Sequence, residues 1–157
     1  MNTHAEIIIG HVHLTVANLD RSLSFYCGLI GLQKGGRSGD RTTLLPGAHH
    51  SIVLDPPHKE AMRETCLRYG GVYRFSFLYP NRKELARVIR RFITVAYEID
   101  GIFDYGPTQA LYLRDPDGIP VELYVECTEI MTHKKSAGLS AFDIKSIDLE
   151  SLLARLK

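Results

Sequence analysis

The feature that most constrains the fold is an internal duplication of one strand, one helix and three further strands. Alternating apolar residues predict a first strand over residues 8–16 in one copy and over 72–78 in the other. A helix follows each strand, over residues 19–29 and about 82–95, because apolar positions there recur with helical spacing. The remaining strands are expected at residues 32–36, 41–45, 51–54, 96–99, 109–114 and 120–125. A repeated unit usually buries its apolar face against its copy, so the order predicts two similar sheet-and-helix units.

The strand over residues 8–16 has one apolar face and one face that carries two histidines. Val12, Leu14 and Val16 point one way, whereas His11 and His13 point the other. A strand normally lays its apolar face on the core. Histidine is the commonest metal ligand in proteins near neutral pH. The pair of imidazoles therefore indicates a functional surface.

The last strand of the second copy repeats this arrangement. Val121, Leu123 and Val125 form its core face, and Glu122 and Tyr124 point to the opposite side. Burying a carboxylate is costly unless a partner compensates for it, so Glu122 is a candidate functional residue. Two such sheets placed side by side would share an open cleft. We expect these residues to line it: His11, His13, Arg74, Ser76, Tyr112, Glu122 and Tyr124.

Length and composition limit the classes of protein to be considered. The 157 residues suffice for one domain over residues 1–126, made of modules 7–57 and 70–126. An extension over residues 127–157, with a short helix at 148–156, completes the expected organisation. The net charge of +1 gives no reason to expect nucleic acid or a membrane surface as partner.

Three cysteines, none in C-x-x-C spacing, argue against a disulfide framework or a thiolate zinc site. They suit a reducing cytoplasm, which is the expected location. The first residues show no basic segment followed by a long apolar run, so no signal peptide is expected. No apolar stretch is long enough to span a bilayer.

Two groups of strings resemble the vicinal oxygen chelate superfamily, which includes glyoxalases, bleomycin-resistance proteins and extradiol dioxygenases. The first group is GHVHL at residues 10–14, NLDRSLSFY at 18–26 and GLIGL at 28–32. The second is ALYLRDPDG at residues 110–118, followed by VELY at 121–124. The resemblance covers residues 7–126 and is strongest to the ring-cleaving dioxygenase-like branch. It implies an α+β fold of two paired βαβββ modules that form an open cleft.

The resemblance also implies a metal in the cleft. Dioxygenase-like members bind Fe²⁺ through a 2-His-1-carboxylate set, for which His11 and Glu122 match the first histidine and the glutamate. Arg74 stands where the second histidine is expected. Glyoxalase-type members use a further carboxylate where this chain has Val53. Relatives often show Asp-His-Gly where Tyr105 replaces the histidine here.

The arginine leaves three alternatives open, because a guanidinium stays protonated and has no lone pair for a metal. In the first, the metal is absent and Arg74 forms an ion pair with Glu122. In the second, Arg74 points away, and His13 or His49 supplies the third ligand. In the third, Arg74 binds an anionic substrate while a weaker metal site persists on His11 and Glu122.

These alternatives correspond to different functions. An active enzyme would be an extradiol-type oxidoreductase that opens the ring of a vicinal diol such as a catechol. Without metal, the chain would bind or sequester a small aromatic or anionic compound, as bleomycin-resistance proteins do. A glyoxalase-type lyase or isomerase is the third candidate, and Val53 argues against it. Arg74, Tyr112 and Tyr124 are the candidates for contact with the substrate. By analogy with this architecture we expect a homodimer.

Overall fold

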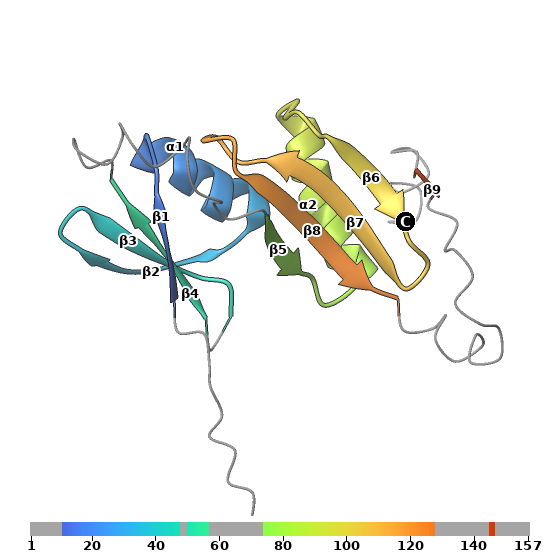
Figure 1. Ribbon diagram of the computed structural model, residues 1–157, viewed down its shortest axis with the longest axis horizontal. Helices are drawn as coiled ribbons and strands as arrows, with labels where there is room; N and C mark the ends of the chain where they lie inside the picture. Colours follow the sequence, from blue (N-terminus) through green and yellow to red (C-terminus); the bar gives the residue numbers. More distant parts are fainter. Residues whose placement is uncertain (1–10, 48–49, 57–73, 128–144, 147–157) are drawn as a thin grey trace, which may run out of the picture. The chain divides into compact units, whose positions relative to one another are not determined.

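The computed structural model describes residues 11–47, 50–56, 74–127 and 145–146. The chain divides into two compact units, residues 1–69 and 70–157 (Figure 1). Each unit is described by itself. The predicted helix at residues 148–156 and the candidate ligand His49 lie outside the described residues. No helix in the described ranges is long and apolar enough to cross a membrane.

The first unit contains one four-stranded sheet in the order β1-β4-β3-β2. Strand β1 pairs with β4 in parallel, and the other pairs are antiparallel. Its elements are β1 (His11–Thr15), α1 (Leu19–Leu23), η1 (Ser24–Ile30), β2 (Gln33–Ser38), β3 (Arg41–Leu45) and β4 (Ser51–Asp55). This is the predicted order of one strand, one helix and three strands.

One face of this sheet is apolar and buried, as the alternation of residues predicts. Leu14 on β1, Leu44 on β3, and Ile52 and Leu54 on β4 are buried, as are Phe25, Tyr26 and Ile30 of the helical segment. His11, His13 and Thr15 alternate with these positions and are partly or largely exposed. The prediction of two distinct faces for β1 is therefore confirmed.

The helical segment of the first unit begins at a side-chain cap and changes its winding after the first turn. The Asn18 side chain accepts a hydrogen bond from the Arg21 backbone N–H at 2.9 Å. From Ser24 onward the helix is a π-helix. It ends at Gly31, whose φ of 96° is the left-handed conformation that glycine adopts most readily. The sequence predicted this end but not the wider turn.

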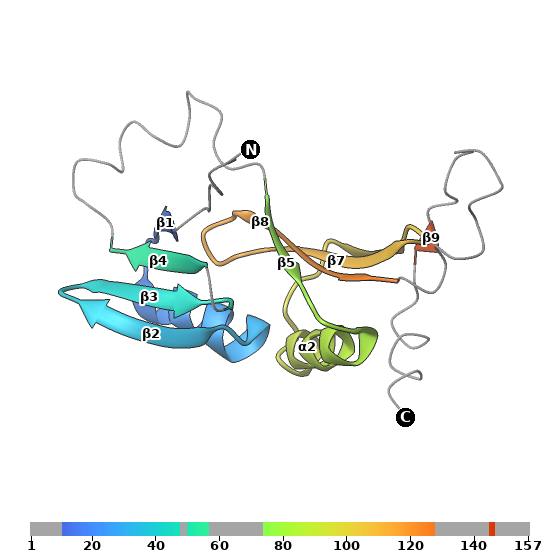
Figure 2. The ribbon, with the colours of Figure 1, turned by 90° about the horizontal axis from the view of Figure 1, so that it is seen from below.

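The second unit has the same arrangement with one added strand. The sheet order is β5-β8-β7-β6-β9, with β5 and β8 parallel and the other pairs antiparallel. Helix α2 lies along one face of this sheet (Figure 2). The elements are β5 (Phe75–Leu78), α2 (Arg82–Thr94), β6 (Gly101–Asp104), β7 (Thr108–Arg114), β8 (Pro120–Glu126) and β9 (Lys145–Ser146).

Helix α2 forms where its apolar stripe and its cap predict it. Asn81 accepts a hydrogen bond from the Glu84 N–H at 2.9 Å and so caps the first turn. Leu85, Val88, Ile89 and Phe92 are buried, whereas the basic residues of the helix are exposed. The core beneath the helix includes Leu111, Leu113, Val121, Leu123 and Val125 from β7 and β8. Together the two units confirm the expected α+β fold of two βαβββ modules.

One predicted strand was wrong. We expected a strand at residues 96–99, but the strand β6 begins at Gly101. Ala96 has a φ of 50° in the turn that ends α2, and the Tyr97 N–H donates to the Phe92 carbonyl. The chain therefore has to travel from the helix back to the sheet before it can pair. The first pairing contact is the hydrogen bond from the Asp100 N–H to the Tyr112 carbonyl, 2.9 Å long.

Candidate functional site

Glu122 lies at the centre of the polar face of the second sheet. It is in register with Ser76 on β5 and with Tyr112 on β7. The Ser76 hydroxyl donates to Glu122 Oε2 at 2.6 Å, and the Tyr112 hydroxyl donates to Oε1 at 2.7 Å. Both carboxylate oxygens are thus bound by side chains of neighbouring strands, which fixes the orientation of the carboxylate.

Arg74 completes these contacts. Its Nε lies 3.3 Å from Glu122 Oε2, and its Cζ lies 5.2 Å from the centre of the Tyr112 ring. The Glu122 side chain is 15% exposed and that of Arg74 is 35% exposed. A guanidinium paired with a carboxylate and placed over an aromatic ring gains from both contacts, more so when water is partly excluded. The sequence-predicted pair of Arg74 and Glu122 is brought together.

Tyr105 extends the network through the hydroxyl of Tyr112. The two hydroxyl oxygens are 3.2 Å apart, with Tyr105 as donor. Burial raises the pKa of Tyr112, and its hydrogen bonds to Tyr105 and Glu122 raise it further. Tyr112 is therefore a neutral hydrogen-bond donor at physiological pH. We call Arg74, Ser76, Tyr105, Tyr112 and Glu122 the Glu122 cluster.

The sequence analysis noted Tyr105 only as a replacement for histidine and missed its link to Tyr112. Its position is set by the turn before β7, where Asp104 accepts hydrogen bonds from the Gly106 N–H and from the Gln109 side chain. The signal that could have found it is its place in the Asp104-Tyr105-Gly106 string, where relatives carry histidine. A side chain at such a position is expected to face the site.

Apolar surface adjoins the Glu122 cluster on the same face. Leu78 follows Arg74 and Ser76 with the period of a strand, and it is 55% exposed. Its partner in register on β8 is Tyr124, which is half-buried. Charged, hydroxyl and apolar groups thus occur together on three adjacent strands. Such a mixture is typical of small-molecule sites.

The polar face of the first sheet carries a different set of side chains. The His11 and His13 ring centres are 5.0 Å apart, and the rings make an angle of 73°. His13 Nδ1 lies 2.7 Å from Asp55 Oδ2, and Arg41 Nε lies 2.5 Å from Asp55 Oδ1. We call these four residues the His13 cluster.

Asp55 was not identified as a site residue from the sequence. Its side chain is 8% exposed, and a carboxylate this buried needs charged or donating partners. The alternation of β4 contained the necessary signal. Asp55 follows Val53 by two residues and therefore points to the face that carries the histidines.

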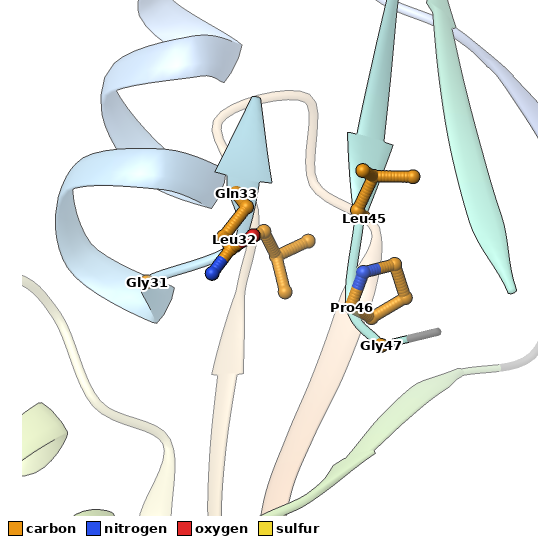
Figure 3. A pocket seen from close by; sticks show the side chains of 6 residues that line it. All are labelled: Gly31, Leu32, Gln33, Leu45, Pro46 and Gly47. Carbon is orange, nitrogen blue, oxygen red and sulfur yellow. The ribbon is translucent and has the colours of Figure 1, made fainter. Parts of the chain in front are cut away.

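A groove of about 480 Å³ lies at the end of β2 and β3 (Figure 3). Leu45 and Gln33, which are partners in register, contribute to its walls together with Leu32 and Pro46. Gly31 and Gly47 complete the lining. Among the described residues, none of the candidate metal-binding or substrate-binding side chains lines this groove.

The donor set of the second unit does not fit the iron site of the dioxygenase-like branch. Arg74, which the resemblance matches to the second histidine, is bound to the carboxylate itself. Among the described residues, no three His, Cys, Asp or Glu side chains converge closely enough to hold a metal ion. Val53 pairs with His13 as Glu122 pairs with Ser76, so the first unit has an apolar residue at the equivalent position. His11 and Glu122 belong to different units, and their approach stays a prediction.

Comparison with known proteins places this fold and these residues in a family. Residues 8–123 match the Glyoxalase/Bleomycin resistance protein/Dioxygenase superfamily. The chain belongs to this superfamily. Among curated proteins it is similar to catechol-2,3-dioxygenase of Bacillus subtilis (strain 168), with 31% identity over 150 residues. The alignment covers 96% of this chain and 52% of the relative, so the chain spans about half the length of that protein.

Solved structures of the superfamily have the same fold. A glyoxylase/bleomycin resistance protein/dioxygenase domain from Frankia sp. EAN1pec superposes with a TM-score of 0.64 at 20% identity. The superposition covers 78% of this chain and all of that one. Lactoylglutathione lyase from Agrobacterium tumefaciens gives a TM-score of 0.58 at 19% identity, with coverage of 79% and 96% respectively. At these identities the likeness concerns the fold alone, because one fold hosts many chemistries.

Proposed function

We propose that the chain binds a small aromatic vicinal diol of the catechol type on the polar face of its second sheet. In this proposal Glu122 contacts the diol directly and is not a ligand of iron. The observation that carries the proposal is the contact of Arg74 with Glu122. The family resemblance matches Arg74 to a position where an iron-binding member has an imidazole. A guanidinium cannot coordinate a metal, but it can donate hydrogen bonds to anionic or hydroxyl oxygens.

The Glu122 cluster offers groups that are complementary to such a diol. The carboxylate accepts hydrogen bonds from the two adjacent hydroxyls, and Arg74 donates to a hydroxyl oxygen or to an anionic substituent. The ring would lie against the apolar surface of Leu78 and Tyr124. Side chains held by one another before the ligand arrives lose little freedom on binding, which favours affinity.

The Bacillus relative supports the class of ligand, since its name refers to catechol and it matches nearly the whole chain. It also favours a second candidate function, the metal-dependent opening of a catechol ring by an oxidoreductase. A divalent metal, Fe²⁺ in that case, would be held by His11 and Glu122 and would supply the binding position for oxygen. The two candidates share the ligand and differ in whether Glu122 binds a metal.

Titration calorimetry of catechol into chain treated with a chelator tests the proposal. We expect binding without metal, and a loss of at least about tenfold in affinity for Arg74→Met, because one charge-assisted contact disappears. Arg90→Met, on the exposed side of α2, is the matched control and should bind like the wild type. Binding that requires added Fe²⁺, with oxygen uptake and a ring-opened product, would replace the proposal by the second candidate.

Arg74→His separates the candidates further. The substitution restores the imidazole of the 2-His-1-carboxylate set, so we expect Fe²⁺ or Ni²⁺ affinity to rise by at least about tenfold. Metal content after dialysis against a known free metal concentration measures this change. Unchanged affinity would mean that residue 74 does not occupy the position of the second histidine ligand.

A further inference from the structure

We propose that the first unit carries a binding site of its own for an imidazole-preferring divalent cation. The ligands are His11 and His13, and Asp55 is the positioning residue that orients His13. This site uses neither Arg74 nor Glu122. It therefore stands independently of the small-molecule site proposed for the second unit.

The separation of the two imidazole rings fits a shared ion. A metal–nitrogen bond of about 2.0–2.1 Å, added to about 1.2 Å from the nitrogen to the ring centre, puts each ring centre about 3.3 Å from the ion. For an angle of about 90–109° at the ion, the ring centres are then about 4.7–5.4 Å apart. The observed separation of His11 and His13 is 5.0 Å, and the steep angle of 73° keeps the rings from stacking.

Asp55 determines which nitrogen of His13 is available. A carboxylate only accepts hydrogen bonds, so the contact of 2.7 Å requires that His13 Nδ1 carries the proton. The lone pair of the neutral ring then lies on Nε2. Histidines that bind metals almost always donate their other N–H to a carboxylate or carbonyl, which fixes both the tautomer and the ring direction. The His13 cluster contains this arrangement.

The positive charge of Arg41 does not prevent a cation from binding to the two histidines. It pairs with Oδ1 of Asp55, whereas His13 is bound to Oδ2, so its charge is offset by the carboxylate. The His13 side chain is 46% exposed, which leaves it accessible to an ion from solution. No third side chain among the described residues joins the two imidazoles, so the remaining positions would be taken by water. Such a site should prefer Ni²⁺ or Cu²⁺ to Mg²⁺ or Ca²⁺.

Titration calorimetry of Ni²⁺ into the tag-free full chain tests this site. We expect one ion per chain, a loss of at least about tenfold in affinity for His11→Ala and for His13→Ala, and about tenfold for Asp55→Asn. His50→Ala removes an exposed histidine outside the cluster and is the matched control, with affinity within about twofold of the wild type. Wild-type affinity in both His11→Ala and His13→Ala would overturn the proposal.

Two further measurements keep the result unambiguous. Glu122→Gln should leave Ni²⁺ affinity within about twofold, whereas loss of binding in this variant would assign the ion to the His11 and Glu122 set and overturn the site proposed here. In nitrogen NMR of the metal-free chain, His13 should show the tautomer protonated at Nδ1, and Asp55→Leu should abolish this preference. The opposite tautomer in the wild type would remove the positioning role of Asp55.

Discussion

The two units have the same topology and corresponding strand registers, yet their polar faces carry different chemistry. Across β1, β4 and β3, His13, Val53 and Thr43 are in register. Across β5, β8 and β7 the corresponding residues are Ser76, Glu122 and Tyr112. His11 and Arg74 stand two residues before the first of each row. The same three strands therefore present an apolar centre in one unit and a carboxylate in the other.

The difference shows which part of a sheet the fold constrains. In both units the buried face is occupied mainly by leucine, isoleucine and valine, because close packing against the helix favours apolar side chains. The opposite face has no such requirement. The first unit places its carboxylate two residues later, at Asp55, and pairs it with both an imidazole and a guanidinium. The second unit places it at Glu122 and pairs it with a guanidinium.

The largest expected effect tests whether the two cores are equivalent. Leu54 and Leu123 occupy corresponding positions and are both fully buried. Each replacement by alanine should lower the free energy of unfolding by about 2–5 kcal/mol, from lost burial and from the cavity left behind. Urea unfolding measures both values. Leu78→Ala, at an exposed position, is the control and should change stability by about 0.5 kcal/mol at most. A much smaller loss of unfolding free energy at one of the two leucines would show that the two cores are not equivalent.

A smaller effect tests the chemistry of the second polar face. Tyr112→Phe removes a hydrogen bond to a carboxylate and should cost about 1.5 kcal/mol, with Tyr124→Phe as the control. The pKa of Tyr112 is raised in the folded chain, so the folded state retains this proton where the unfolded chain loses it. The associated stability should be complete below about pH 10 and decline above it. Absorbance titration at alkaline pH should show one late-titrating tyrosine fewer in Tyr112→Phe, and an unchanged titration would contradict the assignment.

The smallest effect concerns the helix caps, where the two units resemble each other most. Asn18 and Asn81 each accept a hydrogen bond from the backbone N–H three residues later. Asn18→Ala and Asn81→Ala should each cost about 1 kcal/mol, and Asp or Ser at the same positions should restore most of it. Thermal unfolding of the alanine variants and of their aspartate or serine counterparts compares the caps directly. A cost at Asn81 alone would show that the π-helix in the first unit does not depend on the cap of its first turn.

Much of this fold could be predicted because the spacing of apolar residues and the helix-capping residues can be recognised within short stretches of sequence. The strand at residues 41–45 and the helix beginning at residue 82 were predicted at their observed starts, and the two faces of β1 and β8 followed from alternation. The strand β6 was displaced because a left-handed Ala96 lengthens the path back to the sheet. Nothing in the local composition of residues 96–99 reveals that turn.

The candidate site was predictable only where its residues lie in recognisable strings. Glu122, Tyr112 and Arg74 were found through their positions in the two modules, and the structure shows the contact between Arg74 and Glu122. Tyr105 was missed although its partner Tyr112 is only 7 residues away. Asp55 and Arg41 were missed because their contacts join different strands, and the contact of Asp55 with His13 spans 42 residues of sequence. Such pairs depend on strand register, which composition does not specify.

The loop between β7 and β8 limits which changes in its length leave the side chains of β8 on their present faces. The buried carboxylate of Asp115 accepts hydrogen bonds from the Asp117 and Ile119 N–H groups, and so holds the loop at one length. Insertion of a single residue that shifted β8 by one position would exchange Glu122 with Leu123, putting a carboxylate into the core and a leucine beside Arg74. Insertion of two residues would leave Glu122 and Leu123 on their present faces of the sheet. Length variants of this hairpin that shift β8 should therefore differ by even numbers wherever the second sheet keeps the Glu122 cluster.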